Sequence, residues 1–164
     1  MGTYEVEFRD VLMAPYPYRN IRAAGSMGHA DVVSINVKTT KAFASECKSV
    51  DTKHGEIKKF YVSRQVRSKL QFLQMMELQN DGIPCIYPVR WKKYPHHHGE
   101  PVDEKWDIFP LVNHTDIEWP RPSEYDNIDE LKKVWESFSW PVFELGTGMS
   151  IDTWLKMFER GGGR

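Results

Sequence analysis

One short stretch of the sequence combines residue types that can support hydrolytic chemistry. Ser45-Glu46-Cys47-Lys48 ends an apolar run, and on an extended strand the side chains of Glu46 and Lys48 would point to one face while Cys47 points to the other. Asp31 begins an earlier β-rich run that follows a glycine-containing loop. Antiparallel pairing of the two runs through a short polar turn would bring the Asp31 carboxylate close to Glu46.

Two carboxylates that converge on one point repel each other unless a cation lies between them. Ligands that are all oxygen suit Mg²⁺ or Mn²⁺. The adjacent Lys48 would then polarise a metal-bound water, or stabilise the charge that develops on a phosphate during in-line attack. The spacing Asp-x14-Glu-x-Lys is by itself weak, because a carboxylate beside an ammonium can equally be an ordinary surface pair.

The surrounding sequence indicates the elements that would position these residues. We expect helices over 4–13, 63–78, 129–138 and 151–160, and strands over 19–22, 31–37, 42–48, 83–91 and 105–112. Pro84 and Pro88 predict an edge or irregular position for the strand over 83–91, and residues 92–105 read as loop. This order of elements is typical of an α/β or α+β sheet domain.

Apolar residues at helical spacing predict which faces are buried. The two clearest stripes comprise Tyr4, Phe8, Val11 and Leu12 in the first helix, and Val66, Leu70, Leu73 and Met76 in the helix over 63–78. We expect the cysteine and tryptophans to pack in the core or in a subunit contact rather than stack on bases: Cys47, Trp119, Trp135, Trp140 and Trp154.

Composition and charge restrict the class of protein. The 164 residues are 40% hydrophobic and 27% charged, which describes one soluble globular domain, and no run approaches the roughly 20 apolar residues of a membrane span. Two cysteines and the absence of a secretory signal fit a reducing cytosol. Residues 1–98 hold 15 Lys and Arg against 9 Asp and Glu, whereas residues 99–164 hold 7 against 14. The basic part suits a polyanion such as nucleic acid, although a charge run can also be a solvated face.

Together these residues resemble the archaeal-type Holliday-junction resolvases, which also occur in viruses and belong to the PD-(D/E)xK nuclease superfamily. The resemblance rests on Asp31 with Glu46-Cys47-Lys48, and on the segments 5–12, 22–26, 45–49, 65–73 and 82–84. It covers about residues 4–91, a strand near 106–111 and, weakly, 151–158. Two departures stand out: Ala30 replaces a frequent proline, and Val6 stands where the family's first helix carries a basic residue.

The resemblance implies an α/β fold with a restriction-endonuclease-like core, a central mixed β-sheet flanked by α-helices. It implies a single nuclease domain over residues 1–164, with a core of about 1–112 and a C-terminal extension of 113–164 that carries two helices. Residues 92–105 and 113–148 resemble insertions, and no function is transferred to them.

The resemblance also assigns roles at the site. Asp31 and Glu46 would bind the metal directly, with the Cys47 backbone carbonyl as a third ligand, and Glu5 would reach the ion directly or through water. Lys48 would orient the attacking water. The remaining assignments are Arg22 and Ser26 at the scissile phosphate or its neighbour, and Gln65 behind the lysine or the water.

The basic segment that flanks the catalytic strand adds expectations of its own. Lys58 and Lys59 are expected to bind DNA, with Arg90, Lys92 and Lys93 as the alternative surface. His96-His97-His98 is expected to be a flexible, partly protonated loop near DNA, because three consecutive imidazoles cannot all bind one ion without strain.

The implied function is that of a Mg²⁺-dependent crossover junction endodeoxyribonuclease, in which Mn²⁺ can substitute. It would resolve four-way DNA junctions by paired symmetric nicks as a homodimer, because a two-fold substrate suits two symmetric sites. No membrane and no nucleotide cofactor are expected, and the location would be the cytoplasm of a prokaryote, or of an infected host cell for a viral protein. Two alternatives stay open: a PD-(D/E)xK nuclease of another DNA specificity, such as a nickase or repair nuclease, and a non-catalytic DNA-binding protein.

Overall fold

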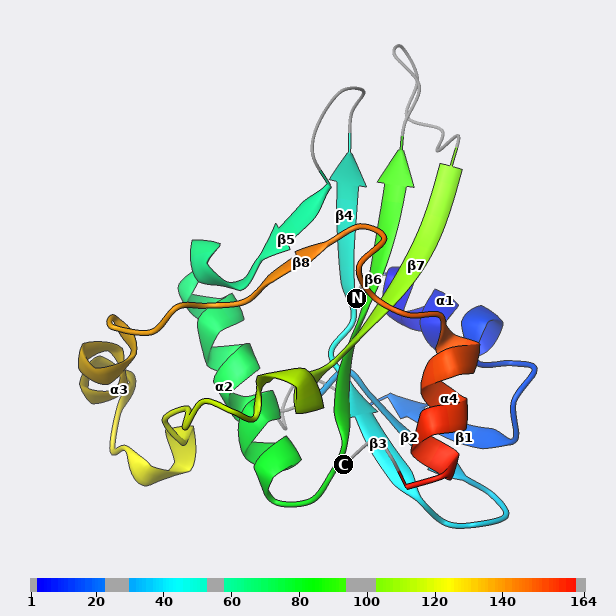
Figure 1. Cartoon of the computed structure of the whole chain (residues 1–164), viewed down its shortest axis with the longest axis horizontal. Coiled ribbons are helices and arrows are strands. Elements are labelled where there is room, and N and C mark those ends of the chain that lie inside the picture. Colours follow the sequence, from blue (N-terminus) through cyan, green and yellow to red (C-terminus); the bar gives the residue numbers. More distant parts are fainter. Residues whose placement is uncertain (1–2, 23–29, 53–57, 94–102, 162–164) are drawn as a thin grey trace.

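A mixed sheet forms the centre of the computed structural model, which describes residues 3–22, 30–52, 58–93 and 103–161 (Figure 1). Its strands are β1 (Tyr18–Arg22), β2 (Val32–Asn36), β3 (Ala42–Ser45), β4 (Lys48–Thr52), β6 (Cys85–Lys93) and β7 (Asp103–Pro110). The strand order is β1-β2-β3-β6-β4, and β7 pairs with β6. β3 and β4 run parallel to β6, while the other pairs are antiparallel.

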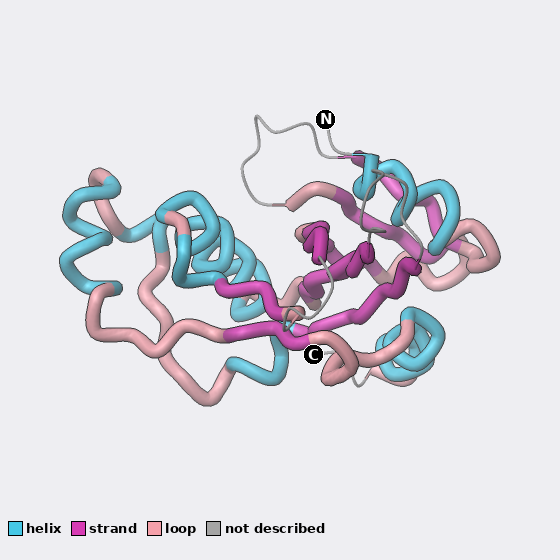
Figure 2. The backbone as a smooth tube through the Cα atoms, turned by 90° about the horizontal axis from the view of Figure 1, so that it is seen from above, coloured by secondary structure: helices cyan, strands magenta, loops and turns pink. Residues whose placement is uncertain are grey.

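Helices cover both faces of this sheet. They are α1 (Thr3–Glu7), which continues as a π-helix over Phe8–Leu12, α2 (Val66–Asn80), α3 (Ile128–Trp135) and α4 (Ile151–Glu159). Single 3₁₀ turns occur at Val62–Arg64, Leu111–His114 and Pro122–Glu124, and β5 (Lys59–Tyr61) pairs with β8 (Val142–Glu144) in a separate two-stranded sheet. In Figure 2 helices lie to both sides of the strands. The expected fold class, a mixed sheet flanked by helices, is confirmed.

The strand residues alternate between two hydrophobic clusters, one on each face of the sheet. In β6, Tyr87 and Val89 pack with α2, whereas Ile86 packs on the opposite side with Phe8 and α4. This alternation follows from the two-residue period of a strand. Cys47 is 1% exposed and belongs to the second cluster, as predicted.

β3 and β4 lie in line along β6 and are separated only by Glu46 and Cys47. The pairs Ser45–Ile86 and Lys48–Val89 have the same register, so one extended segment is interrupted opposite Pro88. Pro88 has no amide hydrogen to donate to this ladder. The expected single strand over 42–48 is therefore two strands, and the interruption falls at the residues with candidate chemistry.

The prediction that the proline-containing strand lies at an edge is wrong. β6 has β3 and β4 on one side and β7 on the other. Its centre tolerates Pro88 because the cross-strand partner Ile108 exchanges both of its backbone hydrogen bonds with Met149, at 2.8 and 3.0 Å. Pro88 therefore needs no donor on that side, and on its other side it faces the interruption.

The first helix buries a different stripe from the predicted one. Phe8 and Met13 are fully buried, but Val11 is 65% exposed. The Met13 amide donates to the Phe8 carbonyl at 3.0 Å, which is the five-residue step of a π-helix. The wider turn moves Val11 off the buried face and brings Met13 onto it.

The other expected elements occur within a few residues of their predicted positions, with three differences. α2 starts at Val66, which is 46% exposed, rather than at residue 63. β6 and β7 extend into the region expected to be loop, and the β5–β8 pair was not expected. Gly82, with φ of +100°, ends α2 by donating its amide to the Gln79 carbonyl.

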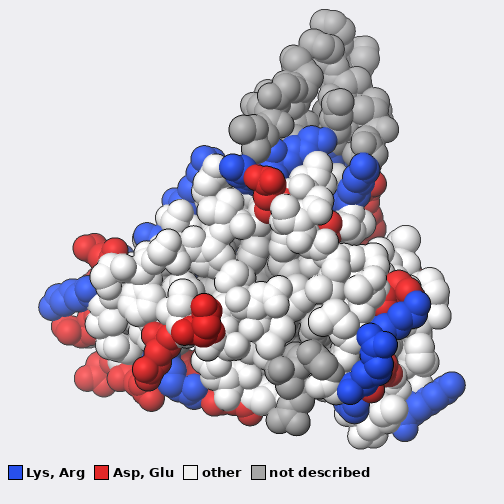
Figure 3. All heavy atoms as spheres, viewed as in Figure 1, with Lys and Arg blue, Asp and Glu red and all other residues white. Residues whose placement is uncertain are grey.

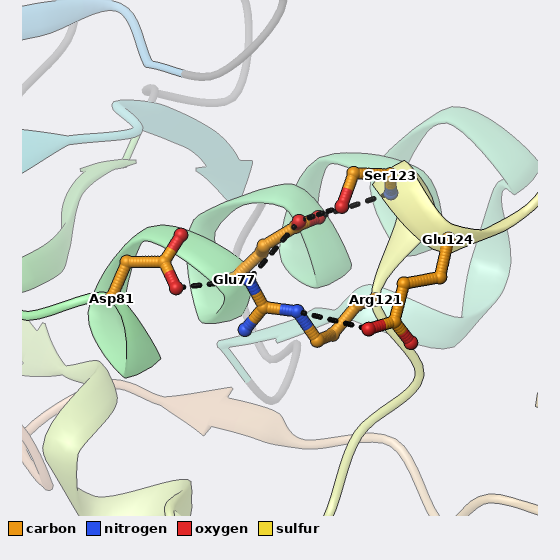
Figure 4. A network of polar contacts seen from close by, with 5 residues as sticks. All are labelled: Glu77, Asp81, Arg121, Ser123 and Glu124. Carbon is orange, nitrogen blue, oxygen red and sulfur yellow. Dashed lines mark hydrogen bonds and ion pairs between the residues drawn. The ribbon is translucent and has the colours of Figure 1, made fainter.

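The chain beyond β7 is attached to α2 by packing and by an ion-pair network. Trp119 and Trp135 are buried beside α2, and Trp154, which belongs to α4, is fully buried, so these three tryptophans are core residues as expected. Figure 4 shows Arg121 between three carboxylates, with distances of 3.4 Å to Glu77, 2.9 Å to Asp81 and 3.7 Å to Glu124. None of the described helices is long and apolar enough to cross a membrane.

Candidate active site

Asp31 lies where β2 separates from the β3–β4 segment. Its backbone amide donates to the Ser45 carbonyl at 2.9 Å, which continues the β2–β3 pairing by one residue. Its carboxylate oxygen Oδ2 then accepts a hydrogen bond from the Cys47 amide at 2.9 Å. The Asp31 side chain thus takes the place that a further residue of β2 would occupy in the ladder, and it is fixed at the interruption.

Glu46 and Lys48 project from the same face of the interrupted strand. Glu46 is 4% exposed, and its amide donates to the Ile86 carbonyl at 3.0 Å. The Lys48 ammonium lies 3.3 Å from Glu46 Oε2, while the Cys47 side chain packs into the core on the other face. The predicted alternation of these three side chains agrees with the structure, and Asp31, Glu46 and Lys48 come together as the sequence indicated.

The ionisation of the two carboxyl groups reflects their crowding. Burial raises the pKa of Glu46 to about 8; the ammonium of Lys48 opposes this increase, and the charge of Asp31 adds to it. Burial also raises the pKa of Asp31, and the charge of Glu5 contributes in the same direction. A cation between these oxygens would remove the mutual repulsion and restore both carboxylates.

The donor set suits a hard divalent cation that keeps water ligands. In the described part of the chain, no group of three or more His, Cys, Asp or Glu side chains is arranged to hold an ion by itself. Asp31 and Glu46 offer carboxylate oxygens, and the Cys47 carbonyl lies in the same interrupted backbone. Two carboxylates, a carbonyl and water are ligands that Mg²⁺ accepts.

Glu5 and Arg22 form a pair at the edge of the site. The Arg22 guanidinium donates to Glu5 Oε2 at 3.0 Å, and the two side chains are 21% and 15% exposed. α1 therefore brings Glu5 towards Asp31, whose pKa it influences. The structure thus brings Arg22 to the Glu5 carboxylate at the edge of the site.

The amide that touches Lys48 belongs to Gln71 and not to Gln65. The Lys48 ammonium donates to Gln71 Oε1 at 2.7 Å, and it lies 5.6 Å from the centre of the Phe60 ring. Gln65 occupies the N-cap position of α2 and is exposed. Both glutamines belong to the segment 65–73 that carries the resemblance, and nothing in the sequence distinguishes their distances to the lysine.

The basic residues expected to bind DNA occupy different environments. Lys59 on β5 pairs with Glu144 on β8 at 3.4 Å, and Lys58 directly precedes β5. Arg90, part of the alternative surface, is only 5% exposed. It bonds to Ser49 Oγ at 3.0 and 3.2 Å and to Glu7 at 3.0 Å, so it joins β6, β4 and α1 and does not belong to an open DNA-binding face. Ser26, Gly25 and His96–His98 lie outside the described residues.

A groove of about 390 Å³ adjoins the carboxylate site. Lys48 forms part of its wall, together with Lys59 and Gln65. The lysine therefore contacts Glu46 and Gln71 and also faces a space that a ligand can enter.

Comparisons with known proteins give matches among solved structures only. The sequence matches no protein-family model. No curated protein matches it either. Among solved structures, it is similar to the 1.6 Å structure of Hjc from Archaeoglobus fulgidus, a Holliday junction resolvase from an archaeal hyperthermophile, with 21% identity over 68% of this chain and 76% of that chain and a TM-score of 0.41. Because a likeness of this extent carries no functional inference, function has to be inferred from the residues of the site.

Proposed function

We propose that the protein is a metal-dependent endonuclease that cuts branched DNA, and that its substrate is the four-way junction. The observation that carries this proposal is the convergence of Asp31, Glu46 and Lys48 at one interruption of the sheet. The sequence resemblance to junction resolvases supports the substrate. The basic character of residues 1–98 is consistent with a nucleic-acid partner.

The site residues divide the chemistry of phosphodiester hydrolysis. Asp31 and Glu46 would hold Mg²⁺ or Mn²⁺ together with the Cys47 carbonyl, and a bound ion lowers the pKa of its water and neutralises phosphate charge. Lys48 orients the attacking water and stabilises the charge that develops on the phosphate. Gln71 fixes the lysine through its 2.7 Å hydrogen bond, so the ammonium keeps its direction without the full charge of a second carboxylate.

Glu5 and Arg22 are proposed to act at the entry side of the site. Glu5 would contact the ion directly or through water. Arg22 would exchange its contact with Glu5 for the scissile phosphate or its neighbour when DNA binds, because a guanidinium binds phosphate in a bidentate manner. Ser26, which follows Arg22 in the sequence, is proposed to contact the same phosphate.

Junction resolution also requires two sites that cut symmetric strands. We infer a homodimer, because closed two-fold symmetry matches the symmetry of the substrate. The proposed location is the cytoplasm of a prokaryotic or infected cell. A PD-(D/E)xK nuclease of another DNA specificity is the alternative, and it would use the same residues.

The deciding experiment compares synthetic DNA substrates of identical sequence content. A four-way junction, a flap and a linear duplex are incubated with Mg²⁺, with Mn²⁺ or with EDTA, and the products are mapped on sequencing gels. Paired symmetric nicks in the junction alone support the proposal. Equal cutting of duplex or flap supports the alternative nuclease, and binding without cutting in both metals contradicts a catalytic function. Asp31→Asn controls for a contaminating nuclease.

A further inference from the structure

The groove beside Lys48 has walls from α1, β4, β5 and the start of α2. Six of its eleven lining residues carry aromatic rings or cations. They are Tyr4, Phe60 and Tyr61, and Lys48, Lys59 and Arg64. Among the described residues that line it, Asp51 is the only carboxylate. Its volume of about 390 Å³ is near the lower end of the range for ligand pockets, roughly 300–1,000 Å³. It therefore suits one small unit and not a length of duplex.

The rings and cations of the groove are accessible. Tyr4, Phe60 and Tyr61 are all partly exposed, in contrast to the buried aromatics of the core. The centre of the Arg64 guanidinium lies over the Tyr61 ring, 4.0 Å from its centre, so the two groups are in cation–π contact. Arg64 makes no ion pair with the described residues, and its charge is available to a ligand.

The location of the groove links it to the reaction. Lys48 lines the groove and also lies 3.3 Å from Glu46. A ligand in the groove would therefore lie next to the phosphate that is attacked at the proposed carboxylate site. Flat aromatic or guanidinium faces beside cations are the combination that binds an unstacked base together with its phosphate.

We propose that the groove binds a single unpaired nucleotide next to the scissile phosphate. Its base stacks on the Tyr61–Arg64 pair, and its phosphate lies towards Lys59, which would exchange its 3.4 Å contact with Glu144 for the phosphate. The proposal rests on the nuclease function proposed above and adds a preference among DNA substrates. The protein favours DNA in which one base leaves the stack at low cost, as at the exchange point of a junction or beside a mismatch.

A second groove of similar size provides an internal control. It measures about 380 Å³, lies between β1 and α4, and is lined by Tyr16, Tyr18, Lys156 and Arg160 among others. Its Lys156 is paired with Asp152 at 2.9 Å, and none of the catalytic residues lines it. It has the same residue types without the connection to Lys48.

The test uses synthetic junctions that carry 2-aminopurine at single positions around the exchange point, because this base fluoresces more strongly when it is unstacked. Binding is measured with the full chain carrying Asp31→Asn, so that the DNA stays intact, and cleavage positions are mapped separately with the native protein. We expect fluorescence to rise on binding only where the probe adjoins the mapped scissile phosphate. Tyr61→Leu and Arg64→Gln should suppress the rise and weaken junction binding roughly tenfold. Tyr61→Phe should restore both, since it keeps the ring.

The matched variants Tyr16→Leu and Arg160→Gln in the second groove should leave fluorescence and affinity unchanged. Equal losses in both grooves, or no rise at any position, would overturn the nucleotide assignment. Failure of the underlying function has a different signature, namely that the native protein neither binds nor cleaves any DNA structure. A mononucleotide such as dAMP could bind the groove tightly while the groove variants leave junction binding unchanged. That result would assign the groove to a free nucleotide and would also overturn the proposal.

Discussion

Glu46 combines deep burial with a second carboxyl group close by, so its ionisation is coupled to the occupancy of the site. Its pKa of about 8 lies above the ordinary value of 4.5. Between these values the folded metal-free protein binds more protons than the unfolded chain. The contribution of this group to stability is therefore complete below pH 4.5 and is lost as the pH rises through about 8. Each pKa unit corresponds to about 1.4 kcal/mol.

We expect Glu46→Gln to remove this pH dependence. In EDTA at pH 8 the variant should be more stable than the native protein, on the order of 1–3 kcal/mol, because it has no charge to bury. Urea unfolding at pH 5 and pH 8, with EDTA or with Mg²⁺, measures the effect. Mg²⁺ should raise the stability of the native protein only. Equal stabilisation of the variant by Mg²⁺ would place the ion elsewhere.

A second prediction at this scale separates Lys48 from the metal ligands. Lys48→Ala should slow the chemical step roughly 100-fold or more while leaving the Mg²⁺ dependence nearly unchanged, because the lysine acts on the water and the transition state. Single-turnover rates at saturating Mg²⁺ measure this effect. Asp31→Asn should instead abolish metal-dependent cleavage and retain junction binding.

Gln71→Ala tests whether the amide positions the lysine. It should give a smaller loss of rate than Lys48→Ala, and the two changes together should not be additive. Gln74→Ala is the matched control on the same helix, because Gln74 makes no side-chain hydrogen bond to the described residues. Equal effects of the two glutamine variants would mean that the contact with Lys48 is without consequence.

Among the elements, Arg90 is the connection that holds the first helix at the site. Its side chain is 6% exposed and bonds to Glu7 on α1 and Ser49 on β4. Val6 stands where the family that the sequence resembles has a basic residue in this helix. In this protein Arg90 of β6 contacts the helix instead, through Glu7. α1 carries Glu5, so its position depends on a residue far away in the sequence.

Arg90→Ala should therefore destabilise the fold by about 2–4 kcal/mol, because it leaves a partly buried Glu7 without its partner. Cleavage should fall further than the loss of folded protein explains, since Glu5 moves with α1. Thermal unfolding and the rate per folded molecule measure the two parts. Arg121→Ala is the control: it breaks an exposed network of similar size (Figure 4) and should cost much less. Similar effects of both variants would contradict the assignment.

The elements show why the sequence predicted the site better than its surroundings. Asp31, Glu46 and Lys48 follow from strand alternation and one hairpin, which are local properties. The exposure of Val11 depends on a π-helical turn, and the central position of Pro88 depends on the way Ile108 bonds to Met149. Gln71 was missed because its contact depends on how α2 packs against β4, which places its Oε1 2.7 Å from the Lys48 ammonium. Residues such as Glu144, which pairs with Lys59, come from a segment without any resemblance.

At the scale of the whole molecule, charge is separated in space as well as in sequence. Figure 3 shows Lys and Arg gathered at the upper end of the strands and again at the lower right, whereas Asp and Glu predominate on the left around α3. On this face, the carboxylates around α3 lie away from the strand ends, although Glu144 on β8 pairs with Lys59 on β5. A polyanion would be drawn to the strand ends and repelled from the α3 side.

Neutralising Lys58 and Lys59 together should weaken binding to all DNA structures and flatten the dependence of affinity on salt. The slope should fall by about one for each phosphate that a lysine no longer neutralises, so by about two at most. Selectivity for junctions should be mostly kept, because in the proposed homodimer the junction's shape would be read by the spacing of the two subunits. Binding isotherms from low to high salt measure the slope. Neutralising Lys132 and Lys133 on α3 is the control. An equal change of the salt slope in that variant would mean that the lysines act only through the net charge of the protein.

The path of the last segment has a consequence for the order of events during synthesis. β8 completes the sheet with β5, Met149 bonds to the centre of β7, and Trp154 closes the cluster beneath Cys47. A ribosome has therefore already made Asp31, Glu46 and Lys48 while both faces of the fold still lack these partners. At roughly 5–20 residues per second, the residues between Lys48 and Trp154 take several seconds or longer to be added. Over that interval a nascent chain carries Asp31, Glu46 and Lys48 without the packing of β8 and α4, so we expect the proposed nuclease site to become rigid only after α4 has been made.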